Sequence, residues 1–179
     1  MRIAVLAATL LLAACAGTPR IIVTEPGGVR PQQLRTYEFQ SSEAVRSAGG
    51  NARRADTQFA ETAARKMAEK GYERAVPGTK PDFVLTYRIA VFAAENPRDA
   101  YALVRDPTSI VGRDTAPDPA GSEGLVREAT LVVMALSGED DKVMWQATAS
   151  GVATGQKELT TGALRAASAM LDRFPTRQR

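Results

Sequence analysis

The sequence predicts an α+β fold with a single, mostly antiparallel four-stranded sheet, the element order β-α-β-β-β-α, and two helices packed on one face. Three patterns predict it. Apolar residues alternate with others over residues 82–92, recur every three or four positions over residues 56–71, and alternate again on both sides of an acidic turn at residues 137–142. Period two is typical of strands, and the longer period is typical of amphipathic helices.

The first half of the predicted domain contains one strand and one helix. The strand is expected over Leu34–Gln40, where two aromatic residues share one side. Residues 41–55 read as a loop. A helix follows, with Asp56 as its N-cap and Gly71 as the residue that ends it. Its other face carries charges of both signs, which we interpret as a solvated surface.

The second half is predicted to contribute three strands and a closing helix. Residues 82–92 form the clearest strand of the chain. Two further strands are expected over about 125–136 and 143–152, and the acidic turn between them predicts an antiparallel hairpin. The last helix is expected over 159–173, where Pro175 stops it.

Alternation divides the predicted sheet into two faces. The helix-facing side is expected to hold Phe83, Leu85, Tyr87, Ile89, Leu131, Val133, Val143, Trp145 and Ala147. The opposite face mixes polar residues with an apolar strip that contains Phe92, Val132, Met134 and Leu136. Such a strip is apolar enough to require a covering element or a partner.

Composition limits the chemistry that this chain can perform. Its 179 residues include 23 Lys and Arg, 20 Asp and Glu, one Cys and no His. Histidine catalysis, an internal disulfide and a Cys/His zinc site are therefore excluded. The net charge of +3 is too small to indicate a nucleic-acid partner. No calcium-loop, phosphate-loop or Ser-x-x-Lys spacing occurs. We predict that the protein is not an enzyme, with no catalytic residue, no metal and no cofactor.

The N-terminus has the pattern of a bacterial export signal. Met1-Arg2 gives a positive start, and the uncharged run of 12 residues from Ile3 to Ala14 is too short to span a bilayer. It ends in Leu12-Ala13-Ala14-Cys15, which resembles the lipobox of bacterial lipoproteins. That resemblance implies cleavage between Ala14 and Cys15, and acylation of the Cys15 sulfur and amino group. The alternative is an ordinary secretory peptide in which Cys15 has no role.

These features predict the organisation of the whole chain. Residues 1–14 are the signal peptide, and 15–33 are the lipidated Cys15 and a flexible tether rich in Pro and Gly. Residues 34–175 form the α+β domain, and 176–179 are a tail. Ala16, rather than Asp, follows the cysteine, which in lipoproteins favours transfer to the outer membrane. We therefore expect a lipid-anchored protein of the bacterial cell envelope, on the outer membrane and facing the periplasm.

Several short motifs in the predicted domain resemble, in the same order, those of the bacterial lipoprotein family DUF4136, a domain of unknown function. The resemblance covers residues 34–175 and implies an envelope lipoprotein without supplying a reaction. The matching segments are Leu34-Arg-Thr-Tyr-Glu-Phe39, Ala68-Glu-Lys-Gly-Tyr72, Pro81-Asp-Phe-Val-Leu-Thr-Tyr87, Glu128-Ala-Thr-Leu-Val-Val133, Val143-Met-Trp-Gln-Ala147 and Leu171-Asp-Arg-Phe-Pro175.

The long connection between the second and third predicted strands is the main candidate for function. It contains four prolines and an apolar island at residues 101–104, and loops of this length are usually functional or disordered. Our leading hypothesis is that the 95–123 loop and the adjoining apolar strip contact another envelope protein. The candidate contact residues are Phe92, Tyr101, Leu103, Val132, Met134 and Leu136.

Two alternatives stand beside that hypothesis. The apolar island can instead fold back onto the strip and cover it, which gives a purely structural loop. The outer sheet face and the 95–123 loop can also enclose a pocket for a small apolar or glycan ligand. The first reading describes a noncatalytic adaptor or structural lipoprotein, and the pocket describes a carrier or sensor.

Overall fold

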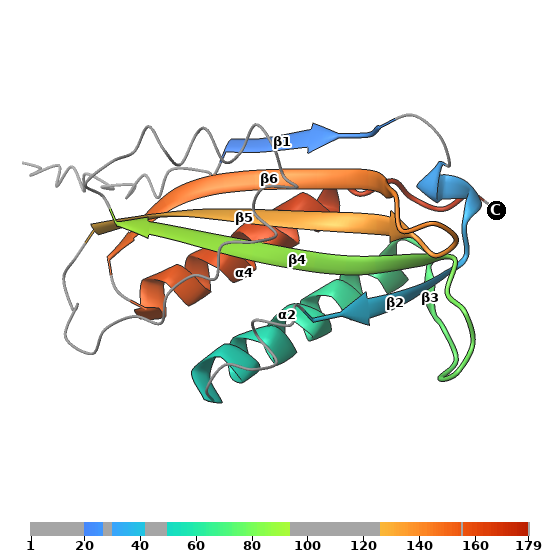
Figure 1. The fold of residues 1–179 in the computed structure, drawn as a ribbon, viewed down its shortest axis with the longest axis horizontal. Helices are drawn as coiled ribbons and strands as arrows, with labels where there is room; N and C mark the ends of the chain where they lie inside the picture. The colour runs from blue at the N-terminus through green and yellow to red at the C-terminus, as the bar shows by residue number, and fades with distance from the viewer. Residues whose placement is uncertain (1–19, 27–29, 42–49, 94–125, 155, 179) are drawn as a thin grey trace, which may run out of the picture.

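The computed structural model describes residues 20–26, 30–41, 50–93, 126–154 and 156–178. They form an α+β domain in which two helices pack on one face of a six-stranded sheet with the strand order β1-β6-β5-β4-β2-β3 (Figure 1). The α+β class and the placement of both helices on one face are as predicted. The four-stranded, mostly antiparallel sheet is not, because two short strands lie outside the predicted set and two of the pairings are parallel.

Three long antiparallel strands form the centre of the sheet, as the alternating patterns predict. They are β4 (Phe83–Ala93), β5 (Val126–Ser137) and β6 (Val143–Thr154). Tyr87 pairs with Val133, which pairs in turn with Ala147 on β6. These strands are long because their β-branched and aromatic residues fit a pleated sheet that is covered on one side by helices.

The two additional strands lie at the edges of the sheet. Strand β1 (Arg20–Thr24) pairs antiparallel with β6, although these residues fall inside the segment predicted to be a tether. Strand β3 (Glu73–Arg74) pairs in parallel with β2 (Thr36–Gln40), which also pairs in parallel with β4. Edge pairing joins segments far apart in sequence, and the local pattern of a five-residue or two-residue strand carries little information about it.

Helix α2 spans Gly50–Glu69 and therefore begins earlier than predicted. Asp56 lies inside the helix and is not its N-cap. Residues 52–55 are Ala and Arg, which favour a helix and extend it toward its N-terminus. The predicted end is confirmed: Gly71 has φ of 85°, and the Tyr72 amide donates a 2.9 Å hydrogen bond to the Met67 carbonyl.

The C-terminal segment packs against the domain. Helix α4 spans Gln156–Asp172, three residues longer at its start than predicted. Beyond it, the amide of Arg177 donates to the Lys70 carbonyl at 3.0 Å, and the amide of Gln178 donates at 2.9 Å to the carbonyl of Gln32, in the short 3-10 helix η1 (Pro31–Gln33). These bonds join the C-terminal segment to both ends of the β2–α2 unit.

The hydrophobic core lies between the helices and one sheet face, with Trp145 and Phe174 fully buried at its centre. Eight of the nine residues predicted to face the helices belong to it or pack against it. The exception is Val143, because a register shift beside Ala135 and Leu136 pairs Val143 with Leu136 on the other face. The buried members are Tyr37, Phe59, Ala63, Met67, Tyr72, Phe83, Leu85, Tyr87, Leu131, Val133, Ala135, Met144, Trp145, Ala147, Ala149, Ala166, Ala167, Met170, Leu171 and Phe174.

Candidate functional site

The predicted apolar strip runs along strand β5 on the face opposite the helices. Val132, Met134 and Leu136 occupy alternate positions of β5 and therefore point to the same side. Val132 lies between Arg88 of β4 and Thr148 of β6 in the strand register. The strip is thus at the middle of the sheet, and no helix of the described segments covers it.

The side chains of this strip differ in their exposure to solvent. Val132 is 2% exposed and Met134 is 7% exposed, whereas Leu136 is only half-buried. In this conformation a partner can therefore reach Leu136 but not the side chains of Val132 or Met134. Phe92 lies on β4, and its side chain is outside the described part of the structure. The other predicted site residues, Ala14, Cys15, Tyr101 and Leu103, and the 95–123 loop also lie outside the described residues.

Hydroxyl groups surround the strip. Thr86, Thr130 and Thr148 are buried on the same face, and the Thr130 and Ser150 hydroxyls lie 3.0 Å apart in a hydrogen bond. Arg88 is half-buried among them, and its guanidinium forms no ion pair with the carboxylate side chains that the structure describes. Around the strip, this face therefore combines apolar side chains with hydroxyl groups and the positive charge of Arg88.

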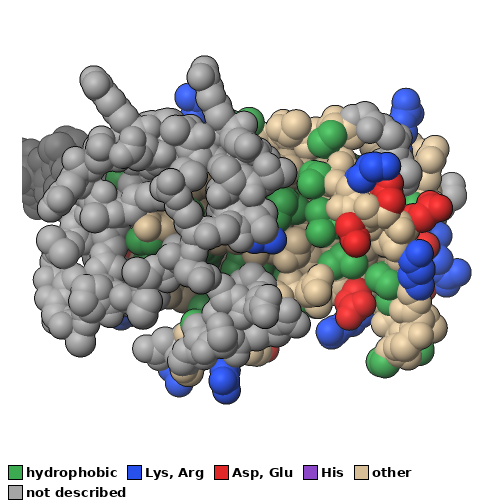
Figure 2. Space-filling model, in the orientation of Figure 1, with side chains coloured by type: hydrophobic (Ala, Val, Ile, Leu, Met, Phe, Trp, Pro, Cys, Tyr) green, Lys and Arg blue, Asp and Glu red, His purple; other side chains and the backbone are tan. Residues whose placement is uncertain are grey.

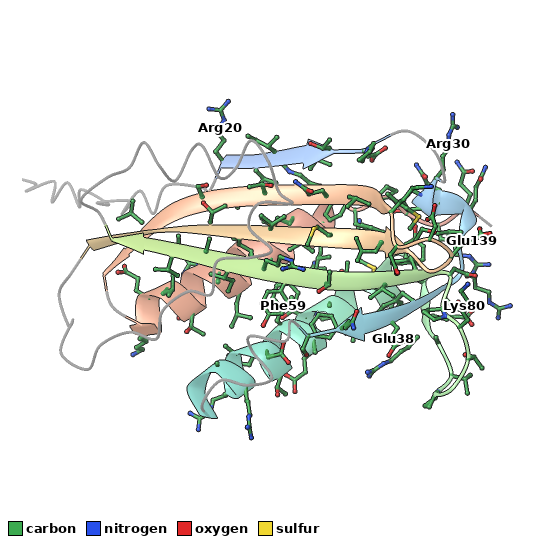
Figure 3. The ribbon with its side chains drawn as sticks, in the orientation of Figure 1. Arg20, Arg30, Glu38, Phe59, Lys80 and Glu139 are labelled. Carbon is green, nitrogen blue, oxygen red and sulfur yellow. The ribbon has the colours of Figure 1, made fainter. Side chains whose placement is uncertain are left out.

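A second surface lies at strand β1 and the neighbouring end of β6. The sequence did not predict it. Arg20 and Ile22 of β1 share the outer face with Ser150 and Thr148, their partners on β6, and Val152 follows on the same face. Ile22 is 50% exposed and Val152 is 69% exposed. Arg20 points away from the sheet at the start of β1 (Figure 3). We call Arg20, Ile22 and Val152 the β1 corner.

The signal for the β1 corner was present in the sequence. Residues 20–24 read Arg-Ile-Ile-Val-Thr, a run of β-branched residues bounded by Pro19 and Pro26. The surrounding segment is rich in Pro and Gly, which favours the prediction of a tether over that of a short strand.

Two carboxylates beside strands β2 and β4 serve structural roles. Asp56 accepts hydrogen bonds from the hydroxyls of Tyr87 and Ser41, and thereby links α2, β4 and the end of β2. Burial, followed by the bond to Asp56, raises the pKa of Tyr87. Asp82 accepts bonds from the Arg35 and Thr36 amides at 2.9 Å and 2.7 Å. Burial acts to raise the Asp82 pKa, but these amide bonds outweigh it and hold the pKa below its usual value.

Charged groups elsewhere gather at one end of the molecule, near Lys80 and Glu139 (Figures 2 and 3). The Arg35–Glu73 pair of 3.0 Å and the pair between Lys142 and Asp140 lie on exposed side chains. Two further kinds of feature are absent from the part of the chain that the structure describes. It contains no group of three or more His, Cys, Asp and Glu residues that could hold a metal ion. None of the described helices is long and apolar enough to cross a membrane.

Comparison with known families identifies one matching family, the domain of unknown function DUF4136, over residues 28–176. A comparison with curated proteins finds no match. The matched range contains the whole of the segment, residues 34–175, on which the motif resemblance rests.

Among solved structures, one neighbour has a TM-score above 0.5 and shows the same kind of fold at low sequence identity. A PDZ domain protein from Parabacteroides distasonis has a TM-score of 0.57 and 14% identity, over 89% of this chain and 36% of that one. The chain thus spans about a third of that protein. A DUF4136 family protein from Bacteroides thetaiotaomicron has a TM-score of 0.47 and 13% identity, over 89% and 98% of the two chains. A PelC dodecamer from Paraburkholderia phytofirmans has a TM-score of 0.45 and 12% identity, over 90% and 100%.

Proposed function

The chain belongs to the DUF4136 family, a family of unknown function, and on that premise we propose that it is a lipid-anchored, noncatalytic protein of the bacterial cell envelope. The observation that carries the proposal is the lipobox-like Leu12-Ala13-Ala14-Cys15, which lies five residues ahead of the first strand of the sheet. Lipid attached at Cys15 holds the folded domain at a membrane surface, because several acyl chains together give stable anchoring. We place that surface at the periplasmic side of the outer membrane.

Mass spectrometry of the protein purified from bacterial membranes tests the anchor. The expected N-terminal peptide of the mature chain starts at Cys15 and carries diacylglycerol on the sulfur and an acyl group on the amine. Cys15→Ser is the matched control, and it is expected to leave the signal uncleaved and to lose the lipid. An unmodified Cys15 in a protein that fractionates with soluble material contradicts the proposal.

For the domain itself, we propose an adaptor role in which the outer sheet face contacts another envelope protein. Support comes from the half-buried Leu136 at the end of the apolar strip, which pairs with half-buried Val84 of β4 and half-buried Val143 of β6 and so forms a small apolar contact area. The carboxylates Asp56 and Asp82 are engaged in structural hydrogen bonds, which favours a binding role over acid–base chemistry.

Photocrosslinking in cells tests the adaptor role. A photoreactive amino acid at Leu136 is expected to capture a defined envelope protein, which then binds the purified domain directly. The same amino acid at exposed Glu61 on helix α2 is the control, because that position faces away from the proposed contact. Equal capture of the same proteins at both positions contradicts a specific contact.

A second candidate is recognition of a glycan by the outer face. It is favoured by the half-buried polar side chains of Arg88 and Ser150 on this face, since sugars are bound by such polar groups next to apolar area. Binding of purified glycan fragments that is lost in Arg88→Ala, with the fold retained, supports this candidate over the adaptor.

A further inference from the structure

Strand β1 shortens the connection between the proposed lipid and the domain. Only residues 16–19 separate Cys15 from Arg20, so the chain between them spans at most about 18 Å when fully extended. A free tether to Leu34 would reach about 65 Å by the same measure. Because β1 belongs to the sheet, the edge of the domain stays close to any membrane that holds Cys15.

The attachment of β1 to the domain is well supported by contacts. All five of its residues pair with β6, and Ile21 and Val23 pack against the hydrophobic core. The Arg173 guanidinium, from the residue that follows helix α4, donates a 2.9 Å hydrogen bond to the Ile21 carbonyl. The short connection therefore ends on a fixed element of the fold.

The surface beside this point has the chemistry of a membrane interface. Three large apolar side chains of the described residues are strongly exposed, and two of them, Ile22 and Val152, belong to the β1 corner. Exposed Arg20 stands next to them and can donate to lipid phosphate. Apolar side chains combined with a cation suit the boundary between headgroups and acyl chains.

We propose that the β1 corner lies against the headgroup layer of the membrane that holds Cys15, with Arg20 on lipid phosphates and with Ile22 and Val152 at the acyl boundary. This inference rests on the proposed lipid anchor. It fixes the orientation of the domain: the β1 edge faces the membrane. Strand β3, at the other edge of the six-stranded sheet, lies five strand spacings away, or about 24 Å.

The composition of the chain permits a direct test of this orientation. Cys15 is the single cysteine and is acylated in the proposed mature protein, so an added cysteine is the only site for a thiol-reactive fluorophore. Ile22→Cys and Val152→Cys place the label in the β1 corner on two different strands. Lys80→Cys places it in the connection between β3 and β4, at the opposite end of the molecule from Arg20 (Figure 3), and is the matched exposed control.

The lipidated variants are reconstituted into vesicles of phosphatidylcholine and phosphatidylglycerol that contain a lipid with a nitroxide headgroup. Labels at positions 22 and 152 are expected to be quenched several-fold more strongly than the label at position 80. Equal quenching at all three positions in protein that floats with the vesicles overturns the orientation and leaves the anchor intact. Protein that lacks the lipid and does not float overturns both proposals. Using two corner labels keeps the outcome independent of the folding of either variant.

Discussion

The hydroxyl of Tyr87 on strand β4 donates a 2.9 Å hydrogen bond to Oδ1 of Asp56 in helix α2. Ser41, just after strand β2, donates to the other carboxylate oxygen. One carboxylate therefore joins three elements beside the aromatic stack of Phe59 and Tyr87, whose ring centroids lie 4.0 Å apart. This junction fixes the position of α2 on the sheet.

Removing Asp56 is expected to weaken the fold. Asp56→Ala leaves the partly buried Tyr87 hydroxyl without its acceptor and lowers the free energy of unfolding by about 1–3 kcal/mol. Tyr87→Phe is expected to cost about 1 kcal/mol. Urea denaturation of both variants and of the double variant measures the coupling. Strictly additive effects would show that the two side chains act separately.

Alkaline pH is expected to reduce stability in part through Tyr72. Burial raises its pKa from 10.0 to about 12, against the opposing effect of Arg177, and its hydroxyl donates to the Pro175 carbonyl at 3.0 Å. The folded chain keeps a proton that the unfolded chain loses, so this contribution is complete below pH 10 and falls as the pH rises toward about 12. Denaturation of Tyr72→Phe across this range should show a shallower decline, whereas parallel declines argue against this role.

Acidic pH is expected to act through Asp82. Its pKa in the folded chain lies below the ordinary value of 3.8, so its stabilising contribution is present above that pH and is lost as the pH falls further. Asp82→Asn removes the ionisable group and should flatten this part of the acid-unfolding curve. It should also lower stability at neutral pH, because the Arg35 and Thr36 amides then bond to a neutral acceptor. If the acid-unfolding curve of Asp82→Asn is the same as that of the unaltered protein, other groups cause the loss of stability at low pH.

The aromatic cluster at the C-terminus is expected to be a major source of stability. Phe174 stacks on Phe83 at 5.7 Å and meets Trp145 edge-to-face at 4.9 Å. Phe174→Ala leaves a cavity and is expected to lower the free energy of unfolding by about 3–5 kcal/mol. Trp145 is the single tryptophan, so its emission should shift to longer wavelength in that variant. Thr176→Ala, at an exposed position nearby, should leave both quantities unchanged.

Substitution by alanine is expected to lower the stability of the fold at Gly138 and to raise it at Gly162. A Cβ on Gly138 would lie 2.0 Å from the Pro81 carbonyl oxygen, so Gly138→Ala forces the backbone apart and is expected to cost about 1–3 kcal/mol. Gly162 lies in helix α4, where an added Cβ would have nothing within 4 Å, and Gly162→Ala should add about 0.5–1 kcal/mol. Thermal unfolding measures both. A stabilising Gly138→Ala would show that the turn is packed differently.

Local patterns in the amino-acid sequence were enough to establish the central elements of this protein. Alternation over β4, β5 and β6 was strong enough to assign the core face, because long strands covered by helices repeat their burial pattern many times. Gly71 and Pro175 marked both helix ends through local backbone preferences. The family was also evident from short motifs in a fixed order.

The edges of the sheet and the roles of particular polar residues emerged only from the folded chain. Strand β1 pairs with residues 146–150, and such a long-range pairing leaves no periodic signal in five residues. Asp56 was expected to be a cap because Asp favours that position, whereas the hydroxyls of Tyr87 and Ser41 give it partners inside the helix. Local sequence encodes the elements that repeat a pattern, and packing between distant segments selects the partners of single residues.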